Sequence, residues 1–110
     1  MAGARAESPC PLYHDAVELI GRRWTGAIVA VLLDAGPLRF RQIAQAVPDL
    51  SDRLLAERMR ELESRGLVTR TELEVGGVEY ALTEMGRDLD TTVCELRTWA
   101  QRWLSQTPRV

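Results

Sequence analysis

One helix constrains the fold of this chain more than any other feature of its sequence. Its apolar residues recur at the i, i+4 and i+7 spacing of a single helical face, namely Leu55, Met59 and Leu62, with Leu54 alongside. Ser51 precedes this run and is a residue type that accepts hydrogen bonds from the free N–H groups of a first helical turn. Gly66 follows it and is the residue type that most often ends a helix. The pattern therefore predicts a helix over residues 52–65 with one face in the core.

The segments on either side of this helix indicate a recurrent motif. Residues 41–47 have apolar side chains at helical spacing, and a turn at residues 48–50 separates them from the helix that follows. Residues 67–73 predict a strand, and residues 79–82 return after a Gly-Gly turn. Two helices joined by a tight turn and followed by a hairpin form the winged helix-turn-helix pattern.

Further helices are expected on both sides of this motif. Residues 12–20 predict a short first helix, and residues 24–34 predict a second because their apolar run meets no turn signal before Gly36. A last helix is expected from the Thr83 cap to a point before Pro108. We therefore predict a mostly helical α+β fold with a two-stranded wing and a C-terminal helix. One domain would span residues 12–106, between tails at residues 1–11 and 107–110.

The last helix carries more apolar surface than one small domain needs. Its apolar residues recur at helical spacing: Leu89, Val93, Leu96, Ala100 and Trp103, flanked by Trp99 and Leu104. A chain of 110 residues buries only a modest fraction of its surface. A second copy of the chain would cover such a stripe, and core packing within one chain is the alternative.

Charge is distributed unevenly along the chain. Residues 20–70 hold nine of the 14 basic residues and six of the 16 acidic ones, although the net charge is −2. Every basic residue is an arginine, whose planar fork suits phosphates and guanine edges. The alternative explanation is compositional bias without a basic patch.

The residues that enzymes and metal sites need are missing. The chain has one histidine, no Gly-rich phosphate loop and no Cys/His metal spacing, so we expect neither an enzyme nor a cofactor or metal site. Residues 1–8 contain no apolar run and no segment is long enough to span a membrane. Two cysteines are too few for a disulfide framework. We therefore expect a soluble cytoplasmic protein with free thiols and no membrane contact.

The candidate nucleic-acid contacts lie on the two central helices. The first turns of a recognition helix face base edges, and a helix N-terminus favours phosphate. We expect Arg53 to contact a base or a phosphate, Ser51 a phosphate, and Arg58 and Arg60 the DNA backbone. The full predicted DNA-binding set is Arg39, Arg41, Gln42, Ser51, Asp52, Arg53, Glu57, Arg58 and Arg60. The alternative is an ordinary solvated helix with ion pairs along its surface.

Several ordered motifs together resemble the HxlR family of bacterial winged-helix regulators over roughly residues 10–103. The matching segments are Cys10-Pro11, Leu19 to Thr25 (LIGRRWT), Gly36 to Ile43 (GPLRFRQI), Leu50 to Glu63 (LSDRLLAERMRELE), Gly66-Leu67-Val68 and Val78 to Gly86 (VEYALTEMG).

The resemblance implies a homodimeric, sequence-specific transcriptional regulator that binds double-stranded DNA. It implies a dimer made by the first and last helices, with interface residues Leu12, Leu19, Leu89, Val93, Leu96, Trp99 and Trp103. Symmetry would then place two recognition helices about 34 Å apart on a pseudopalindromic operator.

Two departures from the family pattern keep another function open. The wing turn, residues 72–77, is short, acidic and without arginine, and Glu57 stands where a glutamine is usual. Glutamate can accept a hydrogen bond from cytosine but repels phosphate. The alternative to a DNA-binding regulator is therefore a winged-helix module that binds proteins and not DNA.

Cys10 is the candidate redox sensor. It lies just before the first helix with His14 four residues on, and both features favour the reactive thiolate. Several HxlR-type regulators sense electrophiles or oxidants through a cysteine at this place. The alternatives are a cysteine without a sensing role and an unidentified small-molecule effector bound near the dimer helices. Cys94 lies beside the apolar stripe, and we expect it to be buried and structural.

Overall fold

The structure, a computed structural model, describes residues 10–106 of the chain. The predicted tails therefore lie almost wholly outside the described residues. The helices are α2 (Pro11–Ile20), α3 (Thr25–Ala35), α4 (Phe40–Ala46), α5 (Asp52–Ser64), α6 (Glu84–Arg87) and α7 (Asp90–Trp103), followed by a 3-10 turn, Leu104–Gln106. The strands are β1 (Leu38–Arg39), β2 (Val68–Glu72) and β3 (Val78–Leu82).

The strands form one antiparallel sheet in the order β1-β3-β2. The predicted hairpin is present, with Val68 opposite Leu82. Gly76 and Gly77 have φ values of 93° and 91° in its turn, a region that residues with a Cβ rarely adopt. The third strand, β1, was not predicted, because the two residues that form it are too few for a period-2 pattern.

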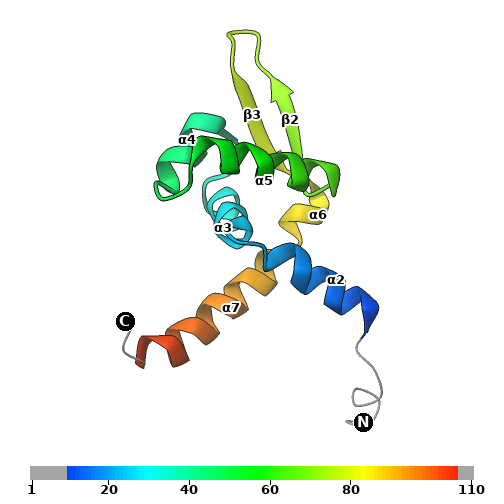
Figure 1. Cartoon of the computed structure of the whole chain (residues 1–110), viewed down its shortest axis with the longest axis vertical. Coiled ribbons are helices and arrows are strands. Elements are labelled where there is room, and N and C mark those ends of the chain that lie inside the picture. Colours follow the sequence, from blue (N-terminus) through cyan, green and yellow to red (C-terminus); the bar gives the residue numbers. More distant parts are fainter. Residues whose placement is uncertain (1–9, 107–110) are drawn as a thin grey trace.

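The core lies where α3, α4 and α5 pack against the base of the hairpin (Figure 1). α5 contributes the predicted stripe of Leu55, Met59 and Leu62, none more than 1% exposed. α3 is buried through Ile28, Val29 and Leu32, which confirms that its apolar run is a helix and not a strand. Other core residues come from α4, the sheet and the residue before β2: Ile43, Leu67, Val68, Tyr80 and Leu82.

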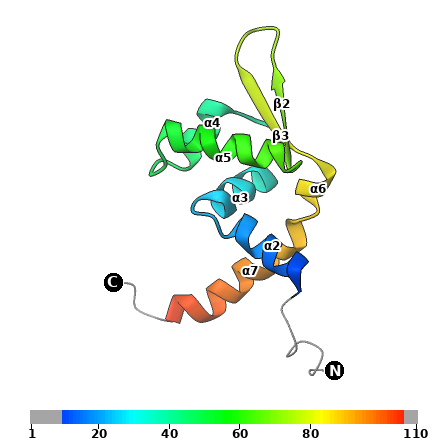
Figure 2. The ribbon, with the colours of Figure 1, turned by 45° about the vertical axis from the view of Figure 1, so that its right-hand side comes forward.

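Helices α2 and α7 extend away from this core at the end of the molecule opposite the wing (Figures 1 and 2). Neither helix contains a buried residue. The described residues measure 56 × 33 × 23 Å, an elongated shape with the wing at one end. None of the described helices is both long and apolar enough to cross a membrane.

The last helix was predicted as one piece from Thr83, and this was wrong. The structure has the short helix α6 and then α7, which begins at Asp90. Thr83 caps α6 as expected, since its hydroxyl oxygen accepts a hydrogen bond from the Gly86 amide at 3.1 Å. Arg87 donates a hydrogen bond of 2.7 Å to the Leu82 carbonyl. The Arg87 contact holds α6 against the end of β3, and the chain turns before it leaves as α7.

Candidate nucleic-acid interface

The N-terminus of α5 is exposed and capped. The Ser51 hydroxyl oxygen accepts a hydrogen bond of 3.1 Å from the Leu54 amide. A hydroxyl that accepts in this way keeps its own proton for donation, so Ser51 retains a donor for a phosphate oxygen. Asp52 lies in the first turn, where its negative charge interacts favourably with the helix dipole.

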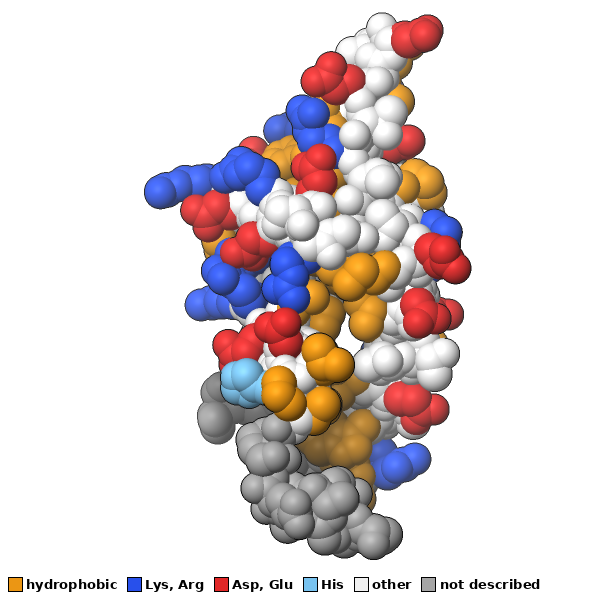
Figure 3. Space-filling model, turned by 90° about the vertical axis from the view of Figure 1, so that its right-hand side faces the viewer, with side chains coloured by type: hydrophobic (Ala, Val, Ile, Leu, Met, Phe, Trp, Pro, Cys, Tyr) orange, Lys and Arg blue, Asp and Glu red, His pale blue; other side chains and the backbone are white. Residues whose placement is uncertain are grey.

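The outer face of α5 is polar, as the apolar spacing predicted. Asp52, Arg53, Glu57 and Arg60 are all exposed, while the stripe that faces the core is buried. Figure 3 shows basic side chains gathered along one side of the upper half of the molecule, interleaved with acidic ones, with a hydrophobic patch below them. The face that α5 offers to a ligand is therefore mixed in charge and contains two arginines.

The start of α4 lies next to the wing. Arg39 donates its backbone amide to the side-chain oxygen of Gln42 at 2.8 Å, which leaves the amide nitrogen of Gln42 as a donor. Arg39 pairs with Glu79 across β1 and β3, and its guanidinium lies close to Gly77 in the wing turn. Arg39, Arg41 and Gln42 are all exposed. The sequence did not indicate that Arg39 belongs to the wing, because this depends on strand pairing across 40 residues.

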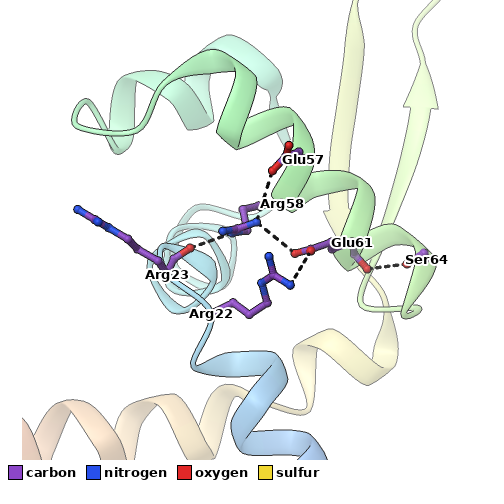
Figure 4. A network of polar contacts seen from close by, with 6 residues as sticks. All are labelled: Arg22, Arg23, Glu57, Arg58, Glu61 and Ser64. Atoms are coloured by element: carbon purple, nitrogen blue, oxygen red, sulfur yellow. Dashed lines mark hydrogen bonds and ion pairs between the residues drawn. The ribbon is translucent and has the colours of Figure 1, made fainter.

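Arg58 does not reach the outer face where it was expected. It is 8% exposed, and its Nε donates a hydrogen bond of 2.9 Å to the Arg23 carbonyl (Figure 4). Its Nη1 lies 3.5 Å from an oxygen of Glu61 and 3.8 Å from an oxygen of Glu57. Position 58 lies three residues after Leu55 and four before Leu62, which places it at the edge of the buried stripe. The prediction that Arg58 contacts the DNA backbone is therefore wrong for this conformation.

The β2–β3 hairpin of the wing contains one arginine, Arg70, which was not predicted to contact DNA. Arg70 is the only basic residue between Val68 and Leu82. Its Nη1 lies 3.5 Å from a carboxylate oxygen of Glu72. Hydrogen bonding to Tyr80, and then to Glu72, raises the pKa of Arg70. Arg70 on the hairpin is therefore already paired with an acidic neighbour, Glu72.

Helices α2 and α7 border an apolar groove. Its walls include Tyr13, Val17 and Ile20 from α2 and Leu96 and Trp99 from α7. The predicted interface residues divide into two groups here. Leu12, Leu96, Trp99 and Trp103 are at least half exposed, whereas Leu19, Leu89 and Val93 are partly buried and pack against the core. The exposed group lies on the outer surface of these two helices.

The two cysteines are both exposed free thiols. Cys10 is the N-cap residue of α2, as its place before Pro11 predicted, and its carbonyl accepts a hydrogen bond from the His14 amide at 3.0 Å. Cys94 lies on α7 and was expected to be buried, which is wrong. The reason is that α7 buries none of its residues in the chain's own core.

A sequence model of the HxlR-like helix-turn-helix family matches residues 19–108. The transcriptional regulator YodB of Bacillus subtilis is 41% identical over 96 residues, which cover 86% of this chain and 85% of YodB. The Bacillus subtilis regulator YvaP, described as uncharacterized, is 40% identical over 97 residues, which cover 86% of this chain and 89% of YvaP.

The described fold also matches solved structures of such regulators. Quinone-bound YodB from B. subtilis has a TM-score of 0.77 at 41% identity, covering 86% of this chain and 99% of that one. The oxidized form of the redox regulator HypR has a TM-score of 0.77 at 31% identity, covering 92% of this chain and all of that one (100%). These matches confirm the winged helix-turn-helix fold. The chain belongs to the HxlR-like helix-turn-helix family of transcriptional regulators.

Proposed function

We propose that this regulator is a cytoplasmic homodimer, that α5 reads a pseudopalindromic operator, and that modification of Cys10 changes its affinity for DNA. The observation that carries the proposal is that the chain has an exposed, capped helix, α5, at one end and two helices without buried residues, α2 and α7, at the other. The first surface fits DNA and the second fits another copy of the chain.

Contact with DNA is assigned to α5 and the start of α4. Arg53 and Glu57 lie one helical turn apart on the outer face, where they can reach base edges in a major groove. Ser51 and Arg60 flank them and suit phosphates. Arg39, Arg41 and Gln42 add donors from α4 and the wing. Such contacts release counterions, so occupancy should fall steeply as salt rises.

Dimerisation is assigned to α2 and α7. Both helices lack a buried residue, although Leu96 and Trp99 are large apolar side chains. A contiguous apolar surface of this kind on a soluble domain marks an interaction site. A twofold interface uses the same patch on each partner, and two DNA-reading helices would then face successive major grooves.

A switch at Cys10 is supported by its position. The thiol is exposed at the N-terminus of α2, the helix assigned to the dimer interface. YodB has been solved in quinone-bound and reduced forms, and HypR in oxidized and reduced forms. With a quinone, the Cys10 thiolate would attack a ring carbon and form an S–C bond, and the quinone would take up the proton as it becomes a hydroquinone. The bulky adduct at the start of α2 would then disturb the dimer.

Fluorescence anisotropy with labelled DNA tests these assignments. Reduced protein would be titrated against the DNA upstream of its own gene and against sites selected from a random pool, with and without benzoquinone. We expect tight binding that benzoquinone weakens in the native protein and in Cys94→Ser, but not in Cys10→Ser. A Cys10→Ser protein that still responds would refute the switch. A melting temperature that rises with a small molecule, in a Cys10-independent way, would instead favour an effector site.

The acidic wing favours one second candidate, a protein-interaction module. The hairpin contains Glu72, Glu74 and Glu79, and Glu72 lies 3.5 Å from Arg70, so their charges disfavour phosphate contact. That candidate predicts normal folding and dimerisation with no salt-dependent affinity for any selected duplex. Tight binding of a selected duplex would exclude it.

A further inference from the structure

Polar contacts join the recognition helix to the segment that contains α2. The Arg23 carbonyl accepts a hydrogen bond from Arg58, an oxygen of Glu61 lies 3.1 Å from Arg22, and Arg65 lies 3.6 Å from Asp15. We call this set the α5–α2 seam: Arg58, Glu61 and Arg65 on one side, and Asp15, Arg22 and the Arg23 carbonyl on the other. Residues 58, 61 and 65 are about one turn apart and lie along one edge of the helix.

The inner end of the seam is buried and tightly constrained. The Arg58 side chain is 9% exposed, and its Nη1 is buried without a hydrogen-bond partner. It lies between the carboxylates of Glu57 and Glu61, as Figure 4 shows. A buried guanidinium that lost these partners would be an uncompensated charge in the interior, which is costly. Arg58 therefore resists any displacement of α5 relative to the linker between α2 and α3, residues 21–24.

The linker side of the seam has an unusual backbone. Trp24, directly after the carbonyl that Arg58 binds, has a φ of 77°, which residues other than glycine rarely adopt. The guanidinium of Arg23 lies 5.5 Å from the Trp24 ring centroid. The bond from Arg58 thus joins α5 to a turn of defined geometry that separates α2 from α3.

Glu61 connects the buried and the exposed parts of the seam. One of its oxygens faces Arg58 at 3.5 Å and the other faces Arg22 at 3.1 Å. The same Arg58 also lies beside Glu57, which is on the outer face of α5. A path of charged contacts therefore runs from the DNA-facing surface of α5 to the end of α2.

We propose that the α5–α2 seam sets the distance and rotation between the two recognition helices of the dimer, so that Arg58 and Glu61 determine which half-site spacing the regulator accepts. The inference rests on the proposed dimeric, DNA-binding function. Its physical basis is that α2 belongs to the dimer interface and α5 reads DNA, so a rigid link between them fixes one α5 relative to the other. Moving a half-site by one base pair shifts it by about 3.4 Å along the DNA.

The test measures spacing preference and not affinity alone. An operator selected from a random pool by the native protein would be prepared with its half-sites unchanged and moved by one base pair in each direction. We expect the native protein to prefer the selected spacing by on the order of tenfold, the effect of a typical operator defect. In Glu61→Gln we expect that preference to fall below about threefold or to move to another spacing.

Glu63→Gln is the matched control. Glu63 is exposed on the same helix and no ion pair of its side chain is among the contacts of the described residues, so the change removes the same charge without touching the seam. Simple electrostatics predicts equal effects of the two variants on every spacing. A loss of stability lowers affinity for all spacings alike and leaves their ratio unchanged. Equal spacing ratios in Glu61→Gln and the native protein would overturn the proposal.

A second set of variants tests the exposed end of the seam. In Asp15→Arg a positive charge would face Arg65, whose partner carboxylate is lost. The added charge alone predicts tighter DNA binding, whereas the seam predicts a weaker spacing preference. The double variant Asp15→Arg/Arg65→Asp keeps the native net charge and rebuilds the pair, so the spacing ratio should return.

These outcomes separate the two proposals. If no duplex is selected from the pool, the proposed function fails and the seam proposal falls with it. If an operator is selected but the double variant has the same spacing ratio as Asp15→Arg, only the seam proposal fails. Circular dichroism of each variant confirms that folded protein is compared throughout.

Discussion

At the scale of single residues, two arginines on α5 that are close in sequence have different surroundings. Arg58 is buried beside Met59 and bonds to the Arg23 carbonyl, whereas Arg60 is exposed on the outer face. The helical period places position 58 beside the buried face and position 60 on the outer face. An apolar pattern, however, identifies only the apolar residues of a buried face. The acceptor that allows Arg58 to be buried comes from 35 residues away, so no local spacing could have indicated it.

The outer face of α5 leads to a prediction that separates base contact from phosphate contact. Arg53→Ala should weaken operator binding by about 1–3 kcal/mol and relax sequence preference at one position, because a base-edge contact is lost. Arg60→Ala should weaken binding to all sequences alike and lower the salt slope by about one. Anisotropy titrations of each variant against the operator and single-base variants measure both effects. Unchanged operator affinity in Arg53→Ala would contradict the assignment.

At the scale of elements, the helix-turn-helix and the hairpin could be predicted because each carries a clear local signal. Ser51, Gly66 and Thr83 mark element ends, and the structure confirms the caps formed by Ser51 and Thr83. The break between α6 and α7 could not be predicted, since it arises from contact with a distant part of the chain. A methyl group added at Gly86 would lie 2.3 Å from the Leu67 carbonyl oxygen, so α6 packs there against backbone.

That close approach gives a stability prediction. Gly86→Ala should lower the free energy of unfolding by about 1–3 kcal/mol, because a backbone carbonyl must move to admit the methyl group. Asp88→Ala, an exposed change just after the same helix, should stay within about 0.5 kcal/mol of the native value. Urea unfolding followed by circular dichroism compares them. A Gly86→Ala protein as stable as Asp88→Ala would show that α6 does not pack as described.

The link between α3 and α7 gives a pH prediction. Arg97 donates hydrogen bonds of 3.2 and 2.9 Å to the two carboxylate oxygens of Asp34. This hydrogen bonding by Arg97 lowers the pKa of Asp34 below its ordinary value of 3.8. A carboxyl group whose pKa is lowered in the folded state stabilises that state above its ordinary pKa and loses this contribution as the pH falls through the lowered value.

Asp34→Asn should therefore melt at a lower temperature than the native protein at pH 7, and the difference should shrink as the pH falls below 3.8. Asp49→Asn, which removes the same charge at an exposed position in the turn before α5, serves as the control. Thermal melts from neutral to acidic pH measure the effect. A difference that grows toward acidic pH would contradict the assigned ion pair.

At the scale of the whole molecule, the elongated shape separates the DNA-reading face from the exposed helices α2 and α7. The sequence predicted an apolar excess on the last helix, and the structure places Leu96 and Trp99 in the groove with α2. It did not predict that Cys94 is exposed, because burial was inferred from proximity to the apolar stripe. Leu89 and Val93 pack against the core, but Leu96 and Trp99 are exposed in the single chain, and Cys94 is exposed with them.

The dimer assignment predicts the effect of one charge in this groove. Trp99→Glu should convert the dimer to a monomer in sedimentation-velocity experiments, because a carboxylate cannot be buried there without a partner. Val75→Glu makes the same kind of change at the wing, where the side chain is 83% exposed, and should leave the dimer intact. A Trp99→Glu protein that remains dimeric would place the interface elsewhere.

The measurement that tests the central claim most directly is the salt dependence of binding to the selected operator, followed by fluorescence anisotropy with the reduced protein. We predict tight binding at low salt and a loss of affinity of about 100-fold or more between 50 and 200 mM salt, because several arginine–phosphate contacts each release a counterion. Arg53→Ala should reduce the affinity at both salt concentrations. The absence of any salt-sensitive affinity for a duplex, in a protein that is folded and dimeric, would contradict the account of this chain as a DNA-reading regulator.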